Sequence, residues 1–136
     1  MSDSAKPEVG AISWTDLTVK NAEEVKNFYS EVVGWKSAAV EMGGYSDFNM
    51  NLPSSGKTVA GICHARGVNA DLPPQWLVYI TVEDVDKSAK RCVELGGKVI
   101  AGPNGMGSYG RYCVIQDPAR AVATLFEPAR SGKMKS

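Results

Sequence analysis

An indole and a carboxylate share one face of a predicted strand near the start of the chain, and these side chains are the best placed for chemistry. Residues 11–19 alternate in character, which puts Trp14 and Asp16 on the same side. In a dry setting such a carboxylate becomes more basic, so Asp16 would act as a general base or as the partner of a cationic ligand. The alternative is that Asp16 is hydrogen-bonded within the fold and has no further role. The residues leave both interpretations open.

Four more side chains complete the predicted ligand-binding set. Tyr79 lies on a strand whose pattern repeats the first one 63 residues later. Thr124 offers a hydroxyl from the last predicted strand, and Tyr109 belongs to a glycine-rich segment. The guanidinium of Arg111 suits the two oxygens of a carboxylate or planar anion, although a loop arginine is more often simply solvated. We expect a planar or aromatic compound between Trp14, Tyr79 and the loop around Tyr109.

The histidine and the cysteines do not predict a catalytic or metal site. His64 is the only histidine, which excludes any site that needs two, and we expect it at the surface where a strand ends. Cys63, Cys92 and Cys113 show neither the pairing of a secreted disulfide scaffold nor a C-x-x-C metal motif. We therefore expect buried or idle thiols.

The segment 105–110 matches the G-x-G-x-x-G pattern of dinucleotide-binding proteins, but its surroundings do not. That fingerprint needs a strand before it and a helix after it, so that the pyrophosphate meets free N–H groups. Here residues 111–116 alternate like a strand, and Asp117-Pro118 follows them. We predict a flexible loop over the mouth of a cavity.

The second half of the chain repeats the first at a spacing of 63 residues, and this duplication must position the side chains named above. Thr18-Val19 returns as Thr81-Val82, and Gly34 returns as Gly97. Each half reads as a strand, a helix and three further strands. We therefore predict an α+β fold in which two tandem β-α-β-β-β modules form a curved mixed sheet around a central cleft.

The predicted boundaries place module one at about 9–65, module two at about 75–128 and a disordered tail at 129–136, within a single domain 1–136. Asn21 and Glu24 are expected to form a capping box for the first helix, which Gly34 ends. The apolar stripe of this helix is Ala22, Val25, Phe28, Tyr29 and Val32. Asp84 or Asp86 caps a second helix that runs through Leu95. Strands are predicted at 11–19, 35–40, 45–52, 58–64, 76–82, 98–101, 109–116 and 121–127.

In each module the helix is expected to cover the sheet face that carries the more apolar side chains. These are Leu17 and Val19 in module one and Val78, Ile80 and Val82 in module two. The opposite faces, with Trp14 and Tyr79, then line the cleft. The alternative is that both aromatic residues fill a core. Asp47, Asn49 and Asn51 also share one strand face, which is either pocket or solvent.

Several short motifs together resemble the vicinal oxygen chelate superfamily, which includes glyoxalase I, the bleomycin-resistance proteins and the extradiol dioxygenases. The motifs are Phe28-Tyr29, Gly34-Trp35, Asp84-Val85-Asp86, Gly96-Gly97-Lys98, and Gly110-Arg111 ahead of Asp117-Pro118. The likeness extends over about 9–128 and is closest to a short glyoxalase-like branch, since Trp14-Thr15-Asp16-Leu17 is similar to its Trp-x-Asp/Glu-Leu strand.

The resemblance implies a divalent metal held by His or Glu side chains that face the cleft. The corresponding positions here are Trp14, Gly61, Leu77 and Thr124. Only the Thr124 hydroxyl could donate to a metal. Moving the set by two residues gives Asp16, Cys63, Tyr79 and Phe126, which supply one carboxylate, one thiol and one phenol. We expect no cofactor and no metal site of the family's kind; a divalent metal held by atypical ligands is the alternative.

The balance of charged residues argues against two classes of binding partner. Fifteen basic residues balance fifteen acidic ones among 136, so no positive field attracts nucleic acid or an anionic membrane. Residues 1–10 contain no apolar run of the length that a signal peptide or membrane span requires, so we expect a cytoplasmic protein.

The favoured function is a small-molecule binding protein that sequesters or senses its ligand on a glyoxalase-like scaffold, since bleomycin-resistance proteins act by binding alone. One alternative is a metal-dependent glyoxalase-, lyase- or dioxygenase-type enzyme with atypical ligands. Another is a purely structural dimer whose cavity is filled by its own side chains. Family members of this length commonly pair, so we expect a homodimer.

Overall fold

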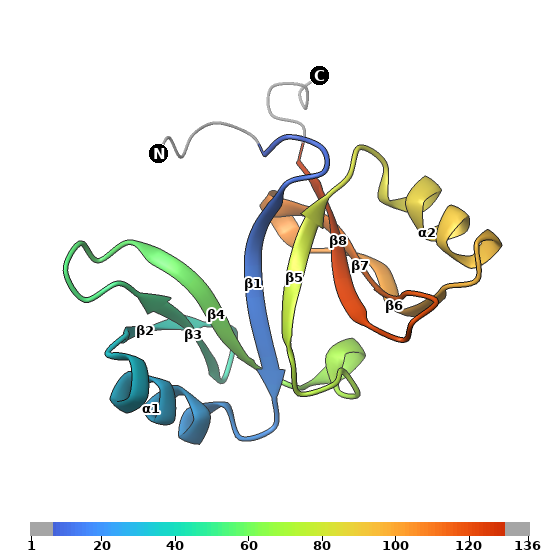
Figure 1. Cartoon of the computed structure of the whole chain (residues 1–136). Helices are drawn as coiled ribbons and strands as arrows, with labels where there is room; N and C mark the ends of the chain where they lie inside the picture. The colour runs from blue at the N-terminus through green and yellow to red at the C-terminus, as the bar shows by residue number, and fades with distance from the viewer. Residues whose placement is uncertain (1–6, 130–136) are drawn as a thin grey trace. The chain divides into compact units, whose positions relative to one another are not determined.

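The computed structural model describes residues 7–129, which form two compact units (Figure 1). One unit is Trp14–Leu77, and the other combines residues 7–13 with 78–129. The predicted disordered tail lies outside the described residues from position 130 onward. The module boundaries and the single domain stay predictions.

The unit Trp14–Leu77 follows the predicted order of strand, helix and three strands. Its elements are β1 (Ile12–Val19, which begins in the other unit), α1 (Ala22–Val33), β2 (Lys36–Glu41), β3 (Ser46–Asn51), β4 (Thr58–His64) and the short 3₁₀ turn η1 (Gly67–Asn69). The strand order is β2-β3-β4-β1; β1 runs parallel to β4, and the other neighbours are antiparallel. The parallel pair sets Asp16 opposite Gly61.

The second unit repeats this plan. Its elements are β5 (Trp76–Thr81), α2 (Val85–Glu94), β6 (Lys98–Gly105), the 3₁₀ turn η2 (Gly107–Tyr109), β7 (Gly110–Gln116) and β8 (Val122–Pro128). The order β5-β8-β7-β6 again has one parallel pair, and it sets Tyr79 opposite Thr124. These residues lie 63 positions after Asp16 and Gly61, so the sequence repeat is also a repeat of strand register. The predicted α+β fold with two β-α-β-β-β repeats is confirmed; the central cleft stays a prediction.

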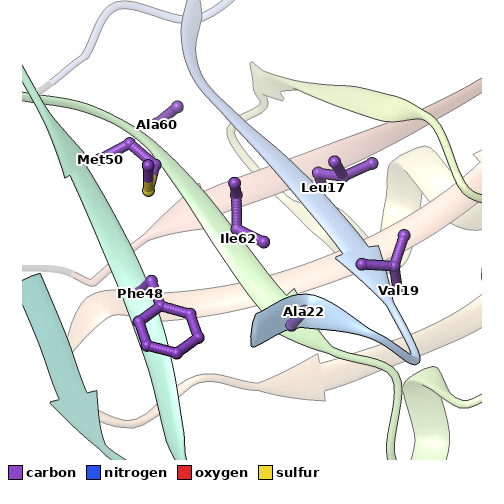
Figure 2. Close-up of a cluster of buried hydrophobic side chains, with 7 residues drawn as sticks. All are labelled: Leu17, Val19, Ala22, Phe48, Met50, Ala60 and Ile62. Carbon is purple, nitrogen blue, oxygen red and sulfur yellow. The ribbon is translucent and has the colours of Figure 1, made fainter. Parts of the chain in front are cut away.

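Seven buried side chains form the core of the unit Trp14–Leu77 (Figure 2). They are Leu17, Val19, Ala22, Phe48, Met50, Ala60 and Ile62. Leu17 and Ile62 are register partners, so both point to the sheet face that α1 covers. Each such aliphatic side chain contributes about 1.5–3 kcal/mol on burial. This face is the one predicted from Leu17 and Val19.

The second unit has the matching core, in which Val85 and Ala89 of α2 pack on Cys113 and Leu125. Ile80 and Val82 lie against it, which confirms the face predicted for module two. Cys113 is fully buried, as expected of an idle thiol.

The two helices begin differently. Asp84 caps α2 as predicted, because its carboxylate accepts from the backbone N–H groups of Asp86 and Lys87. Asn21 precedes α1, but its side chain makes no cap; the amide Nδ2 donates instead to Glu24 Oε1 at 3.1 Å. The predicted capping box is therefore wrong, because the side chains of Asn21 and Glu24 bond each other and not the backbone N–H groups at the start of the helix.

Two further predictions need correction. The apolar stripe of α1 is only partly buried, because Phe28 and Val32 are 56% and 64% exposed. Strand β6 was expected to end at Ala101, before Gly102-Pro103, but it continues to Gly105 with two register shifts against β7. A proline is tolerated there because β6 is an edge strand. In residues 7–129, none of the helices is long and apolar enough to cross a bilayer.

Candidate functional site

The structure brings Trp14 and Asp16 together. Both side chains are half-buried on the face of β1 opposite Leu17 and Val19, and the indole Nε1–H donates to Asp16 Oδ1 at 2.7 Å. A charge-assisted bond of this length fixes the orientation of both groups. The carboxylate is thus anchored within the fold, which supports part of the plainer alternative for Asp16. Its role toward a ligand stays a prediction.

Gly61 makes room for this pair. It lies opposite Asp16 in the parallel ladder, and a Cβ atom built on it would stand 2.4 Å from Asp16 Oδ1 and 3.4 Å from the Trp14 ring. Any side chain at position 61 would therefore displace the carboxylate. Asp16 occupies the space that a metal ligand at position 61 would need.

A thiol and a second carboxylate continue the same surface. Cys63 is paired with Thr18 in register, and Asn49 lies opposite Gly61, which places the polar face of β3 on this side. Burial, followed by the charges of Asp16 and Asp47, raises the pKa of the Cys63 thiol. A protonated thiol is a poor nucleophile and a poor metal ligand.

His64 was predicted at the surface where a strand ends, and the structure places it half-buried at the end of β4. Its side chain is only 24% exposed, and Asp47 Oδ1 lies 2.8 Å from its backbone N–H and 3.3 Å from the ring Nδ1. The ring also meets the edge of Tyr45 at a centroid distance of 5.6 Å. Tyr45 in turn lies under the guanidinium of Arg66. These contacts hold His64 in place, because the pairing of β3 with β4 brings Asp47 next to it.

Sequence reasoning left the group Asp47, Cys63 and His64 without a role. The alternation of Asp47, Asn49 and Asn51 did predict one shared face. The contact of Asp47 with a residue 17 positions away could not be read from spacing, because it depends on how far β3 and β4 pair.

In the second unit the structure brings Tyr79 and Thr124 together. They are register partners, Thr124 is 1% exposed, and the Tyr79 ring lies 6.4 Å from that of Phe126. Leu77 is also buried, at 2% exposed. A hydroxyl buried to this degree has little access to a ligand, whereas Tyr79 is only half-buried.

Arg111 and Tyr109 lie apart from that pair. The Arg111 guanidinium bonds both oxygens of Asp86 in α2, and these bonds lower the pKa of the Asp86 carboxyl below its ordinary value. Arg111 is therefore on the face that α2 covers, where an anion would compete with Asp86. Tyr109 is 75% exposed in η2. Strand β7 follows η2 directly, so the G-x-G-x-x-G segment lacks the helix of a dinucleotide site, as predicted.

The residues do not fit a divalent metal of the family's kind. Of the four positions that the resemblance implies, Trp14, Gly61 and Leu77 offer no metal donor, and Thr124 is a buried hydroxyl. Within residues 7–129, no three His, Cys, Asp or Glu side chains are grouped so that they could hold an ion. Burial raises the pKa of the Cys63 thiol, so this side chain is protonated in the metal-free protein.

A shallow groove of about 270 Å³ lies at the carboxyl end of β1. Its lining is Thr18, Val19, Lys20, Asn21, Ala65, Ala70, Leu72 and Pro74. Apart from the ammonium of Lys20 and the amide of Asn21, this lining is largely apolar. None of the predicted site residues contributes to it.

The chain is similar to a known protein family and to several curated proteins. The family model described as the glyoxalase/bleomycin resistance protein/dioxygenase superfamily matches residues 11–122. CFP32 of Mycobacterium bovis, which carries a provisional glyoxylase name, is 30% identical over 90% of this chain and 46% of its own length. The anthracycline biosynthesis protein DnrV of Streptomyces peucetius is 31% identical over 93% of this chain and 49% of its own. The chain thus spans about half the length of these curated relatives.

Among solved structures, methylmalonyl-CoA epimerase of Mycobacterium tuberculosis is similar with a TM-score of 0.57 and 17% identity, over 96% of this chain and 95% of the epimerase. The Streptomyces coelicolor epimerase is similar with a TM-score of 0.55 and 15% identity, over 90% of this chain and all of the epimerase. At such identities the likeness concerns the fold alone.

Proposed function

Since the chain belongs to the glyoxalase/bleomycin resistance protein/dioxygenase superfamily, we propose that it binds a small planar or aromatic molecule without the divalent metal of the family's enzymes. The binding surface is the face of β1, β3 and β4 that carries Trp14, Asp16 and Asp47. On the second unit the half-buried Tyr79 and the exposed Tyr109 remain candidate contacts, whereas Thr124 is buried and Arg111 is bound to Asp86.

One observation carries the proposal: Asp16 lies over Gly61 and accepts from Trp14. The two module-one positions expected to donate to a metal therefore hold an indole and the backbone of a glycine. An indole ring next to a fixed carboxylate suits a flat ligand with a hydrogen-bond donor or a positive charge. Such a surface recognises a molecule by shape and polarity, and it needs no Lewis acid for that.

The relatives support a small-molecule role and leave its chemistry open. The names of these relatives refer to a glyoxylase and to the biosynthesis of anthracyclines, which are polycyclic aromatic compounds. An aromatic ligand suits the indole of Trp14. An acidic ligand suits this surface less well, because Asp16 and Asp47 are themselves acidic. Homodimerisation is part of the same proposal.

The proposal is tested with a panel of planar aromatic compounds, each with and without a protonated amine, by thermal shift and tryptophan fluorescence. A true ligand at a hundredfold excess over its Kd stabilises by about 2.7 kcal/mol, which raises the melting temperature by several degrees. Trp14→Phe and Asp16→Asn are expected to weaken binding about tenfold or more. Trp35→Phe and Asp71→Asn are the matched controls and are expected to bind as the unsubstituted chain does.

The pH dependence adds a second readout. If Asp16 contacts the ligand, affinity changes between about pH 4 and pH 8, and Asp16→Asn removes that change. An identical pH profile in both proteins would exclude the contact. If the aromatic compounds bind only after a metal has been added to the protein, the result would instead favour a metal-dependent enzyme with atypical metal ligands.

A further inference from the structure

Arg66 carries a guanidinium that has no acidic partner among residues 7–129. The group lies 3.8 Å from the centroid of the Tyr45 ring, and the residue is exposed. Stacking on an aromatic ring limits the motion of an arginine side chain but leaves its N–H donors available. An arginine held in this way is suited to bind both oxygens of a carboxylate.

The backbone around Arg66 is held on both sides. The N–H group of Ala65 donates to the carbonyl of Val19 at 2.9 Å, and the carbonyl of Arg66 accepts from the N–H group of Asn69 at 2.9 Å. These bonds attach the end of β4 to β1 and to η1. Arg66 therefore starts from a fixed position, which lowers the cost of ordering it around a ligand.

His64 offers a hydrogen-bond acceptor next to this donor. It lies two residues before Arg66 and contacts the same ring, with a centroid distance of 5.6 Å to Tyr45. Its Nδ1 lies 3.3 Å from Oδ1 of Asp47. Because a carboxylate only accepts, the neutral imidazole carries its proton on Nδ1 and its lone pair on Nε2. No hydrogen bond within residues 7–129 involves Nε2, and the side chain is 24% exposed.

Other charged groups lie close to this pair. Asp47 opposes an anion, but its carboxylate already accepts from the backbone N–H of His64 at 2.8 Å and faces Nδ1. Lys26 favours an anion, and its Nζ lies 4.7 Å from the centroid of the Phe48 ring, which is 6.2 Å from the His64 ring. The Glu23 carboxylate lies 3.4 Å from that ammonium. This even balance suits a ligand with one negative charge better than a dianion.

The pair is separate from the surface proposed for planar aromatic ligands. His64 is the register partner of Val19, whose side chain belongs to the core that α1 covers. Trp14 and Asp16 lie on the opposite face of β1. A ligand at His64 therefore leaves the aromatic surface open, and the two proposals can fail independently.

We propose that Arg66 and His64 bind a small 2-hydroxy carboxylic acid. The carboxylate accepts from the guanidinium of Arg66, and the hydroxyl donates to Nε2 of His64. In such an acid the hydroxyl stands on the carbon next to the carboxylate, which matches a donor and an acceptor that border one aromatic ring. An acid without the hydroxyl leaves Nε2 unpaired, and an alcohol leaves Arg66 unpaired.

The first test is a titration followed by NMR, because the chain contains a single histidine whose ring signals are unambiguous in protein without a histidine tag. The probes are glycolate and mandelate, each beside the matched acid without the hydroxyl, acetate and phenylacetate, at constant pH and ionic strength. At least one hydroxy acid is expected to shift the His64 signals with a Kd of about 10 mM or below and to bind about tenfold more tightly than its matched acid. Unmoved signals, or equal affinities within both pairs, overturn the proposal.

Arg66 is tested with substitutions that leave the histidine signal in place. Arg66→Gln is expected to weaken binding of the hydroxy acid about tenfold or more. Arg66→Lys keeps the charge but loses the planar pair of N–H donors, so it is expected to give a smaller loss. Arg91→Gln removes the same charge from α2 and is the matched control. Binding that survives Arg66→Gln, or that Arg91→Gln weakens equally, contradicts a site at Arg66.

His64→Phe keeps a flat ring beside Tyr45 but removes the acceptor, and its binding is measured by calorimetry. It is expected to bring the affinities for the hydroxy acid and the matched acid within about twofold of each other. A loss by the same factor for both acids would show that His64 only supports the local structure, which contradicts the assigned contact. Trp14→Phe and Asp16→Asn are expected to leave hydroxy-acid binding unchanged, and a loss in either would contradict a separate site.

Discussion

Gly61 is required by its neighbours on the sheet, not by its backbone conformation. Its φ angle is outside the left-handed region, so no conformational strain would accompany a larger residue. The restriction is steric and comes from Asp16 Oδ1, which lies 2.4 Å from an added Cβ. The side chain of Asp16 cannot move away without loosening its bond to Trp14.

Gly61→Ala is therefore expected to lower the free energy of unfolding by about 1–3 kcal/mol, the usual cost of overpacking. Chemical denaturation measures this change. Gly105→Ala is the matched control, because position 105 has neither a positive φ nor an atom within 4 Å of an added Cβ. Asp16→Ala in the Gly61→Ala background should recover part of the loss, so strictly additive effects of the two changes would argue against the steric explanation.

The Cys63 thiol predicts a dependence of stability on alkaline pH. Its pKa is raised in the folded protein from an ordinary value of 9.0, chiefly by burial. The stabilisation is therefore complete below pH 9.0 and is lost as the pH rises above it, by up to about 1.4 kcal/mol per pH unit. Denaturation curves from pH 7 to 10.5 for the unsubstituted chain and Cys63→Ala measure the difference. Parallel curves for the two proteins would show that the thiol is not responsible.

At the scale of elements, the order of strands and helices followed from alternation and helical periodicity, while the ends of elements depended on tertiary contacts. Leu17, Val19, Ile80 and Val82 were placed on the correct face because a period of two fixes sides. The predicted end of β6 was wrong because a strand at the edge of a sheet tolerates proline. The sequence does not show which strands lie at the edge. The contact of His64 with Asp47 could not be predicted for a related reason, because it depends on how far β3 pairs with β4.

The helix starts give the clearest element-scale prediction. Asp84 accepts two backbone N–H groups of α2, so Asp84→Ala is expected to cost about 1 kcal/mol of stability. Asn21 makes no such bond to α1, so Asn21→Ala is expected to change stability much less. Thermal unfolding of the two variants side by side tests this contrast. An equal loss for both would mean that Asn21 caps α1 in solution.

At the scale of the whole molecule, the duplication was the most reliable feature of the sequence. The offset of 63 residues predicted which positions correspond, and the parallel pairs Asp16 with Gly61 and Tyr79 with Thr124 obey it. The candidate site was less predictable. Trp14 and Asp16 do meet, but the bond of Arg111 to Asp86 required knowing that β7 turns this residue toward α2.

The proposed metal independence belongs to this scale, because tight metal binding stabilises the entire fold. Addition of Zn, Ni, Mn or Fe in excess is expected to leave the melting temperature within about 1 °C, whereas saturation of a tight site would add several kcal/mol. Metal analysis of the purified protein is the companion measurement. One equivalent of a transition metal per chain, together with an activity that a chelator abolishes, would contradict the proposal.

The contact of Asp16 with Gly61 also constrains the order in which this sequence can change. A histidine introduced at position 61 alone would collide with the carboxylate, so a shorter residue at position 16 has to come first. Each of these two changes would look unfavourable or neutral in the absence of the other. Positions 16 and 61 are therefore expected to tolerate a change together better than either change alone.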